Sequence, residues 1–171
     1  KENGRGRYEV FDETMRESVV ELLELETGLR NAIVRDEFCL YYQPIISVET
    51  GRLFALEALI RWKHPERGLV SPGDFIPIAE ESGLIVPIGE WVLKRGCTQI
   101  DEWSKSFSPH EPLRISINIS AKQFGRVSMS DTLREVLQET CIDGVCLHLE
   151  LTETAFLYEP EVLRREFQAI R

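Results

Sequence analysis

The chain has 171 residues, of which 43% are hydrophobic and 29% are charged, proportions that are ordinary for a globular protein. Its net charge of −9 disfavours nonspecific binding to nucleic acid or to an anionic membrane surface, so we expect no DNA or RNA duplex as a partner. No apolar run approaches the roughly 20 residues that span a bilayer, and we expect no membrane segment in this sequence. These properties predict a cytoplasmic protein, in which any tether to the inner membrane would lie in parts of a longer parent.

The cysteines do not follow a metal-binding pattern. Cys141 and Cys146 are near neighbours, but no second cysteine pair or histidine follows them at zinc-site spacing. Cys39 and Cys97 lie in apolar or helical stretches. We therefore expect four reduced, partly buried thiols.

The N-terminal part of the sequence divides into a polar tail and a helix. Residues 1–12 begin polar and glycine-rich and end in a short strand-like run, as the tail of an upstream domain would. Residues 13–36 are predicted to form a linker helix, because apolar residues recur there at heptad-like spacing. These residues are Met15, Val19, Leu22, Leu29 and Ile33, with Glu26 at the remaining heptad position. The pattern fits a short coiled coil, and equally a helix packed on the following domain.

A hairpin is predicted next. Residues 38–48 and 53–62 are rich in aromatic and β-branched side chains and are separated by the short turn sequence "ETGR". The connection is too short for a crossover, so the two strands should run antiparallel. Pro44 has no backbone donor and fits best near a strand end or on an edge strand.

The remaining sequence alternates between helices and strands. We expect a short helix over 71–83 with Ser71 near its N-cap, and a long amphipathic helix over 87–107. A strand (113–120), a helix (131–141), a strand (147–154) and a last helix (159–171) complete the series. This order predicts an α/β fold with parallel strands joined by right-handed crossovers. Because the sequence stops inside a predicted helix, we expect it to be cut within a domain.

Three of the predicted strands carry an oxygen ligand on a polar face. Strand alternation places Glu57, Asn118 and Glu150 on faces opposite to the apolar residues of their strands. Two carboxylates and an amide suit a hard divalent cation such as Mg²⁺ or Mn²⁺, although a polar face is also what the solvated side of a sheet presents. Glu57 and Arg61 are separated by about 13 Å along a strand, too far to pair directly, so Arg61 should contact something else on the same face.

Several spaced motifs resemble those of EAL domains, the phosphodiesterases that open cyclic di-GMP. They are "YQPI" (42–45), "EALIRW" (57–62), "HPERGLVSPGDFIPIAEESG" (64–83), "NISAKQF" (118–124) and "ELTET" (150–154). Residues 1–12 resemble the ending of many GGDEF (diguanylate cyclase) domains. The resemblance implies a GGDEF tail at 1–12, a linker helix at 13–36 and an EAL domain at 37–171 that lacks its second half.

The resemblance also implies a fold and a set of roles. The fold would be the N-terminal part of a modified (β/α)₈ TIM-like barrel with an antiparallel first strand. Glu57, Asn118 and Glu150 match metal-ligand positions, with Glu57 and Glu150 catalytic. Gln43 and Arg61 match positions that contact the dinucleotide, and Glu153 matches a supporting acidic position.

The implied reaction is hydrolysis of cyclic di-GMP to 5′-pGpG in bacterial signalling, with two Mg²⁺ or Mn²⁺ ions roughly 4 Å apart in the complete domain. The family's later acidic residues and its lysine would lie downstream, so residues 1–171 alone are predicted to be inactive. The alternatives are a cyclic di-GMP receptor without hydrolysis and a dimerisation or regulatory module. Expected partners are cyclic di-GMP, an upstream GGDEF domain in the same chain and a second copy in a homodimer.

Overall fold

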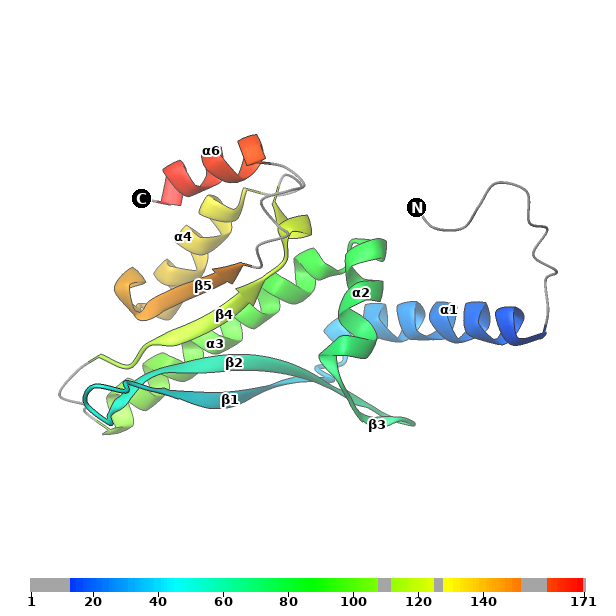
Figure 1. Ribbon diagram of the computed structural model, residues 1–171, viewed down its shortest axis with the longest axis horizontal. Helices are drawn as coiled ribbons and strands as arrows, with labels where there is room; N and C mark the ends of the chain where they lie inside the picture. The colour runs from blue at the N-terminus through cyan, green and yellow to red at the C-terminus, as the bar shows by residue number, and fades with distance from the viewer. Residues whose placement is uncertain (1–12, 108–111, 125–127, 152–159, 171) are drawn as a thin grey trace.

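The computed structural model describes residues 13–107, 112–124, 128–151 and 160–170 (Figure 1). Its helices are α1 (Glu13–Val34), α2 (Pro72–Ser82), α3 (Ile85–Phe107), α4 (Met129–Thr140) and α6 (Pro160–Ile170), with short 3₁₀ turns η1 (Ala121–Gln123) and η2 (Gly144–Cys146). Its strands are β1 (Phe38–Ile46), β2 (Leu53–His64), β3 (Gly68–Val70), β4 (Ile115–Ile119) and β5 (Leu147–Leu151). In these ranges no helix combines the length and the apolar character needed to cross a bilayer.

The strands form one mixed sheet in the order β1-β2-β4-β5. Strand β1 is antiparallel to β2, with Gln43 opposite Glu57, whereas β2, β4 and β5 are parallel to one another. The predictions of an α/β fold, an antiparallel opening hairpin and parallel strands after it are confirmed. Helix α1 ends at Val34, close to the predicted end of the linker helix, while residues 1–12 lie outside the described ranges.

The sequence predicted no element between the hairpin and the helix over 71–83, and the structure has a strand there. The second strand does not end at Trp62 but continues to His64, and the chain then returns as β3, antiparallel to β2. The turn is held by His64, whose Nδ1 accepts hydrogen bonds from the backbone N–H groups of Glu66 and Arg67. Gly68 adopts a φ of 69°, which glycine tolerates best. A three-residue strand is too short to show the alternation from which strands are predicted.

The hydrophobic core lies between the sheet and the helices that cover it. The three isoleucines of β4, Ile115, Ile117 and Ile119, are buried, and α3 approaches this face so closely at Gly96 that a Cβ there would lie 2.9 Å from Cδ1 of Ile115. At the other end of β2, the rings of Phe38 and Phe75 pack on the ring of Trp62. The face of each strand that was predicted to be apolar is therefore the face that builds the core.

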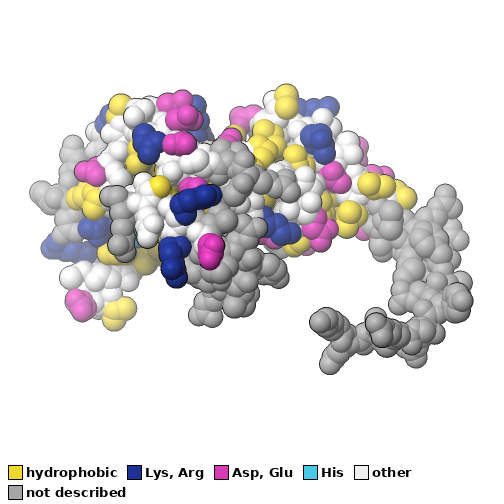
Figure 2. Space-filling model, turned by 90° about the horizontal axis from the view of Figure 1, so that it is seen from above, with side chains coloured by type: hydrophobic (Ala, Val, Ile, Leu, Met, Phe, Trp, Pro, Cys, Tyr) yellow, Lys and Arg dark blue, Asp and Glu magenta, His cyan; other side chains and the backbone are white. Residues whose placement is uncertain are grey.

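Helix α1 packs on the domain through one side. Leu25, Leu29 and Ala32 are buried against the core, which supports the interpretation of α1 as a helix packed on the following domain. Nearer the start of the helix, Val20, Leu22 and Leu23 are exposed. Figure 2 shows hydrophobic side chains at the surface over the part of the molecule formed by α1 and α2. Whether this surface also forms a coiled coil with a second copy stays a prediction.

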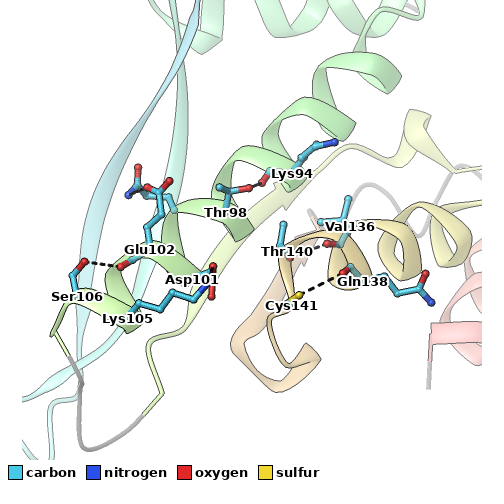
Figure 3. A network of polar contacts seen from close by, with 11 residues as sticks. Lys94, Thr98, Asp101, Glu102, Lys105, Ser106, Val136, Gln138, Thr140 and Cys141 are labelled. Atoms are coloured by element: carbon cyan, nitrogen blue, oxygen red, sulfur yellow. Dashed lines mark hydrogen bonds and ion pairs between the residues drawn. The ribbon is translucent and has the colours of Figure 1, made fainter.

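Polar contacts along α3 and α4 are mostly local. In Figure 3 the hydroxyl of Thr98 donates to the carbonyl of Lys94, and that of Ser106 donates to the carbonyl of Glu102, both at 2.8 Å. The hydroxyl of Thr140 likewise donates to a carbonyl one turn earlier in α4. These bonds satisfy polar side chains within single helices, so the apolar faces supply the packing that positions α3 against the sheet.

Candidate functional site

The predicted ligands lie on neighbouring strands of the sheet. Glu57 on β2 is aligned with Ser116 on β4, and Asn118, two residues further along β4, is aligned with Glu150 on β5. Gln43 on β1 is aligned with Glu57 from the other side. Cross-strand partners project from the same face of a sheet. The fold therefore brings Gln43, Glu57, Asn118 and Glu150 onto one face, although their roles remain predictions.

Two hydrogen bonds organise the side chains on this face. Nδ2 of Asn118 donates to Oε1 of Glu57 at 2.8 Å, and the hydroxyl of Ser116 donates to Oε1 of Glu150 in a short contact. Glu57 is half-buried, whereas Asn118 and Glu150 are exposed to solvent. Both carboxylates are thus held by a neighbour on β4 while the site stays accessible. Ser116 lies two residues before Asn118 on β4 and shares its face, and its bond to Glu150 was not predicted from the sequence.

These residues fit a hard divalent cation. Among the described residues no three His, Cys, Asp or Glu side chains gather as a metal-binding group. The third oxygen would come from Asn118, whose amide nitrogen donates to Glu57 and whose amide oxygen is therefore the atom available as a ligand. A set with only two carboxylates suits Mg²⁺, which usually keeps several waters and binds substrate phosphates as well. Without a cation, Glu57 and Glu150 would repel a phosphate ester.

Strand spacing predicted that Arg61 is too far from Glu57 to pair with it, and the structure agrees with this prediction. Nη1 of Arg61 donates to the backbone carbonyl of Ile60 at 2.8 Å. Its guanidinium carbon lies 5.6 Å from the ring centroid of Tyr41 on β1. The guanidinium of Arg61 is therefore placed at the β1 side of the face that carries Gln43 and Glu57. Tyr41 was not singled out from the sequence.

A buried network fixes the backbone that follows Asn118. The side chain of Gln123, only 4% exposed, accepts a hydrogen bond from the N–H of Ser120 at 2.8 Å and closes a capping box around η1. The hydroxyl of Ser120 donates at 2.6 Å to Oε1 of Glu80, which comes from α2. The chain therefore turns sharply two residues after Asn118, and helix α2 contributes to the turn. Sequence reasoning missed Glu80, because nothing local links α2 to β4.

Gly89 has no side chain, and this leaves room for the buried side chain of Gln123. Replacing Gly89 should therefore disturb the turn at η1. A Cβ at Gly89 on α3 would lie 1.9 Å from Nε2 of the buried Gln123. Overpacking of this kind typically lowers the free energy of unfolding by about 1–3 kcal/mol. The intrinsic helix preference of alanine over glycine returns about 1 kcal/mol. We expect Gly89→Ala to be less stable than wild type by up to about 2 kcal/mol in urea unfolding, with weaker metal binding.

Gly73 on α2 provides the matched control for that substitution. A Cβ at Gly73 would meet nothing closer than the Ser71 hydroxyl oxygen at 4.0 Å. Gly73→Ala should therefore be as stable as wild type or slightly more stable. Equal stability of Gly89→Ala and Gly73→Ala would show that Gln123 moves aside freely and that Gly89 does not hold the turn.

Burial raises the pKa of three side chains in the described part of the chain. Burial raises the pKa of Tyr42 to about 12, against the opposing effect of Arg95, and the Tyr42 ring packs edge-on against Trp103. Burial also raises the pKa of the Cys97 thiol to about 12 and raises the pKa of Cys146. These groups stay protonated at neutral pH. All four cysteines are free thiols, as predicted, although Cys141 is exposed and not partly buried.

A cleft of about 740 Å³ opens beside residues 58–60 in the middle of β2, the end of β4 and Glu150 of β5. Its polar lining includes Asn118 and Glu150 together with Glu80, Ser120 and Lys122, and the rest of its wall is largely apolar. The predicted metal ligands Asn118 and Glu150 thus border a hollow large enough for a small ligand. Glu153, the predicted supporting residue, lies outside the described residues.

Comparison with known proteins identifies the family. The EAL domain profile matches residues 26–171. The chain belongs to the EAL domain family. The cyclic di-GMP phosphodiesterase PdeR of Escherichia coli is 42% identical over 163 residues, which are 95% of this chain and 24% of PdeR. The matched range excludes residues 1–12, so the resemblance of that segment to a GGDEF ending stays a prediction.

Solved EAL structures have the same fold. The structure named "PaMucR Phosphodiesterase, c-di-GMP complex" is 36% identical, with a TM-score of 0.76 over 85% of this chain and 60% of that chain. The EAL domain of Xanthomonas citri FimX in complex with c-di-GMP is 26% identical, with a TM-score of 0.77 over 91% of this chain and 59% of the other. This EAL chain thus spans less than two thirds of each relative compared here. The match supports the expected TIM-barrel-like α/β fold.

Proposed function

We propose that this EAL domain contributes to a metal-dependent phosphodiesterase that hydrolyses cyclic di-GMP to linear 5′-pGpG in the bacterial cytoplasm. The observation that carries the proposal is the hydrogen bond from Asn118 to Glu57, which joins two predicted ligands from β4 and β2, with Glu150 aligned beside Asn118. The relative PdeR is a cyclic di-GMP phosphodiesterase, and two of the similar structures are complexes with c-di-GMP.

The proposal assigns a role to each of the predicted site residues. Glu57, Asn118 and Glu150 would hold Mg²⁺ or Mn²⁺, two ions in the complete domain. When bound, the metal supplies the charge that activates a water and offsets the phosphate charge. Gln43 and Arg61 would bind the dinucleotide, with Arg61 at a phosphate, since a guanidinium is suited to phosphate oxygens. Glu153 would support the site.

The wider assembly is part of the same proposal. An upstream GGDEF domain would precede α1 in the chain, and a homodimer would form through the EAL domain or through α1. Among the described residues, the exposed Val20, Leu22 and Leu23 on α1 are the side chains that a helix-mediated dimer would bury.

The proposal is tested by following the dinucleotide and its product. Full-length protein incubated with cyclic di-GMP and Mn²⁺ or Mg²⁺ should yield pGpG by chromatography. Excess chelator should stop the reaction, and added metal should restore it, because the carboxylates cannot neutralise a phosphate themselves. Tight binding of cyclic di-GMP by calorimetry without any pGpG would instead identify a receptor.

A parallel arm uses residues 1–171 alone. Two metal ions need more oxygen ligands than the side chains of Glu57, Asn118 and Glu150 can supply. This chain should therefore give no measurable pGpG under the same conditions. Steady turnover by this chain would show that further ligands are unnecessary.

A further inference from the structure

The two adjacent tyrosines of β1 have different surroundings. Tyr42 lies on the core side, where its ring packs edge-on against Trp103. Tyr41 lies on the opposite side, is 49% exposed, and has the guanidinium of Arg61 over its ring at 5.6 Å from the centroid. Strand alternation puts Tyr41 on the face of Gln43, the cross-strand partner of Glu57. The Tyr41 ring thus borders the candidate site without belonging to the core.

The contact with Tyr41 restricts a flexible side chain. Arginine has several rotatable bonds, and binding a phosphate through an unrestrained guanidinium carries an ordering cost. Arg61 is limited from two directions, by the ring of Tyr41 and by the bond from its Nη1 to the carbonyl of Ile60. The carbonyl bond uses one of the five guanidinium N–H donors, so the others remain for a ligand.

We propose that Tyr41 is a positioning residue for Arg61. Its ring holds the guanidinium at the β1 side of the site, so that a phosphate of the dinucleotide meets a preorganised cation. This inference rests on the proposed function, in which Arg61 binds a phosphate. Tyr41 itself need not touch the ligand, and its effect should pass entirely through Arg61.

The first measurement separates substrate binding from turnover in the full-length protein. Loss of a partly exposed cation–π contact corresponds to about a two- to fivefold change in affinity. We therefore expect Tyr41→Ala to raise KM for cyclic di-GMP by about two- to fivefold and to leave kcat nearly unchanged. Tyr41→Phe should restore the wild-type KM, because it keeps the ring, whereas Tyr41→Leu should behave like alanine. A wild-type KM for Tyr41→Ala, or a Tyr41→Phe variant as impaired as alanine, would overturn the proposal.

A double-mutant cycle tests whether Tyr41 acts through Arg61. Arg61→Ala should raise KM, and adding Tyr41→Ala to it should change KM no further. A further rise in that background would mean that the ring contacts the ligand directly, which would overturn the positioning role. If Arg61→Ala leaves KM and dinucleotide affinity unchanged, the phosphate role of Arg61 in the proposed function is wrong, whatever Tyr41→Ala does.

The chain supplies a matched control at the other end of the sheet. Phe54, near the start of β2, is 43% exposed and has the guanidinium of Arg114 at 5.0 Å from its ring centroid. Phe54→Ala therefore removes a similar aromatic–arginine pair, together with an edge-on contact between Phe54 and His148 on β5. It should leave KM unchanged. A KM rise equal to that of Tyr41→Ala would show that the effect is a general loosening of the sheet and would overturn the proposal.

Discussion

Replacing Glu57 with alanine should lower the rate of cyclic di-GMP hydrolysis by about a hundredfold or more while leaving the fold intact. Glu57 is half-buried and accepts a hydrogen bond from Asn118, so its removal takes away a negative charge and frees the Asn118 amide. If Glu57 and Asn118 are metal ligands as proposed, both changes should weaken metal binding. The loss should appear in kcat/KM of the full-length protein with Mn²⁺ or Mg²⁺, and the unfolding midpoint should change little.

Glu57→Gln separates the charge from the shape of this side chain. Its amide oxygen still accepts the hydrogen bond from Asn118, so the geometry is kept while the charge is lost. If charge is what holds the metal, Glu57→Gln should be nearly as inactive as Glu57→Ala. The exposed Glu49, in the turn between β1 and β2, is the matched control, and Glu49→Ala should keep wild-type activity. Hydrolysis by Glu57→Ala at the wild-type rate would refute the metal-ligand role.

Replacing Trp62 with alanine should have the largest effect on stability, a loss of about 3–5 kcal/mol in the free energy of unfolding. Trp62 is fully buried and packs on Phe75 with ring centroids 5.9 Å apart. A Cβ at Gly28 of α1 would lie 2.9 Å from its Cη2, so the ring also fills the contact between α1 and β2. Alanine would leave a cavity at the point where helix, strand and core meet. Urea unfolding measures the loss.

Trp62→Phe isolates the polar part of the Trp62 contact. The indole Nε1–H donates to Oε2 of Glu37 at 3.1 Å, and phenylalanine keeps an aromatic ring but not this donor. Trp62→Phe should therefore lose less than Trp62→Ala, and part of its loss comes from the missing bond to a charged acceptor, worth about 1.5–3 kcal/mol. A loss below about 1 kcal/mol for Trp62→Ala would mean that the core refills the space.

The spacing of apolar and polar residues along the sequence predicted those features of the structure that depend on residues close together in the chain. Side chains in a strand alternate between two faces, so the shared orientation of Glu57, Asn118 and Glu150 followed once three strands were recognised. The antiparallel hairpin followed from the length of its turn. The spaced motifs, and not periodicity, indicated the family, which the profile match over residues 26–171 confirms.

Contacts between distant segments could not be predicted in the same way. The bond from Ser120 to Glu80 depends on where α2 lies against β4, and no local pattern in either segment reports that. The placement of Arg61 on Tyr41 depends on the register of β1 against β2, which the sequence left open. Strand β3 was missed because three residues carry too little signal. Glu153 stays a prediction.

The antiparallel pairing of β1 with β2 has a consequence for how the site assembles during folding. Gln43, Tyr41, Glu57 and Arg61 all belong to one hairpin, so the chain needs to close only a short loop to bring them together. Asn118 meets Glu57 across a sequence separation of 61 residues, through a parallel pairing that requires the intervening helices. Non-local pairings of this kind form more slowly than local hairpins. The side of the site proposed to bind the dinucleotide should therefore be ordered before the side proposed to hold the metal.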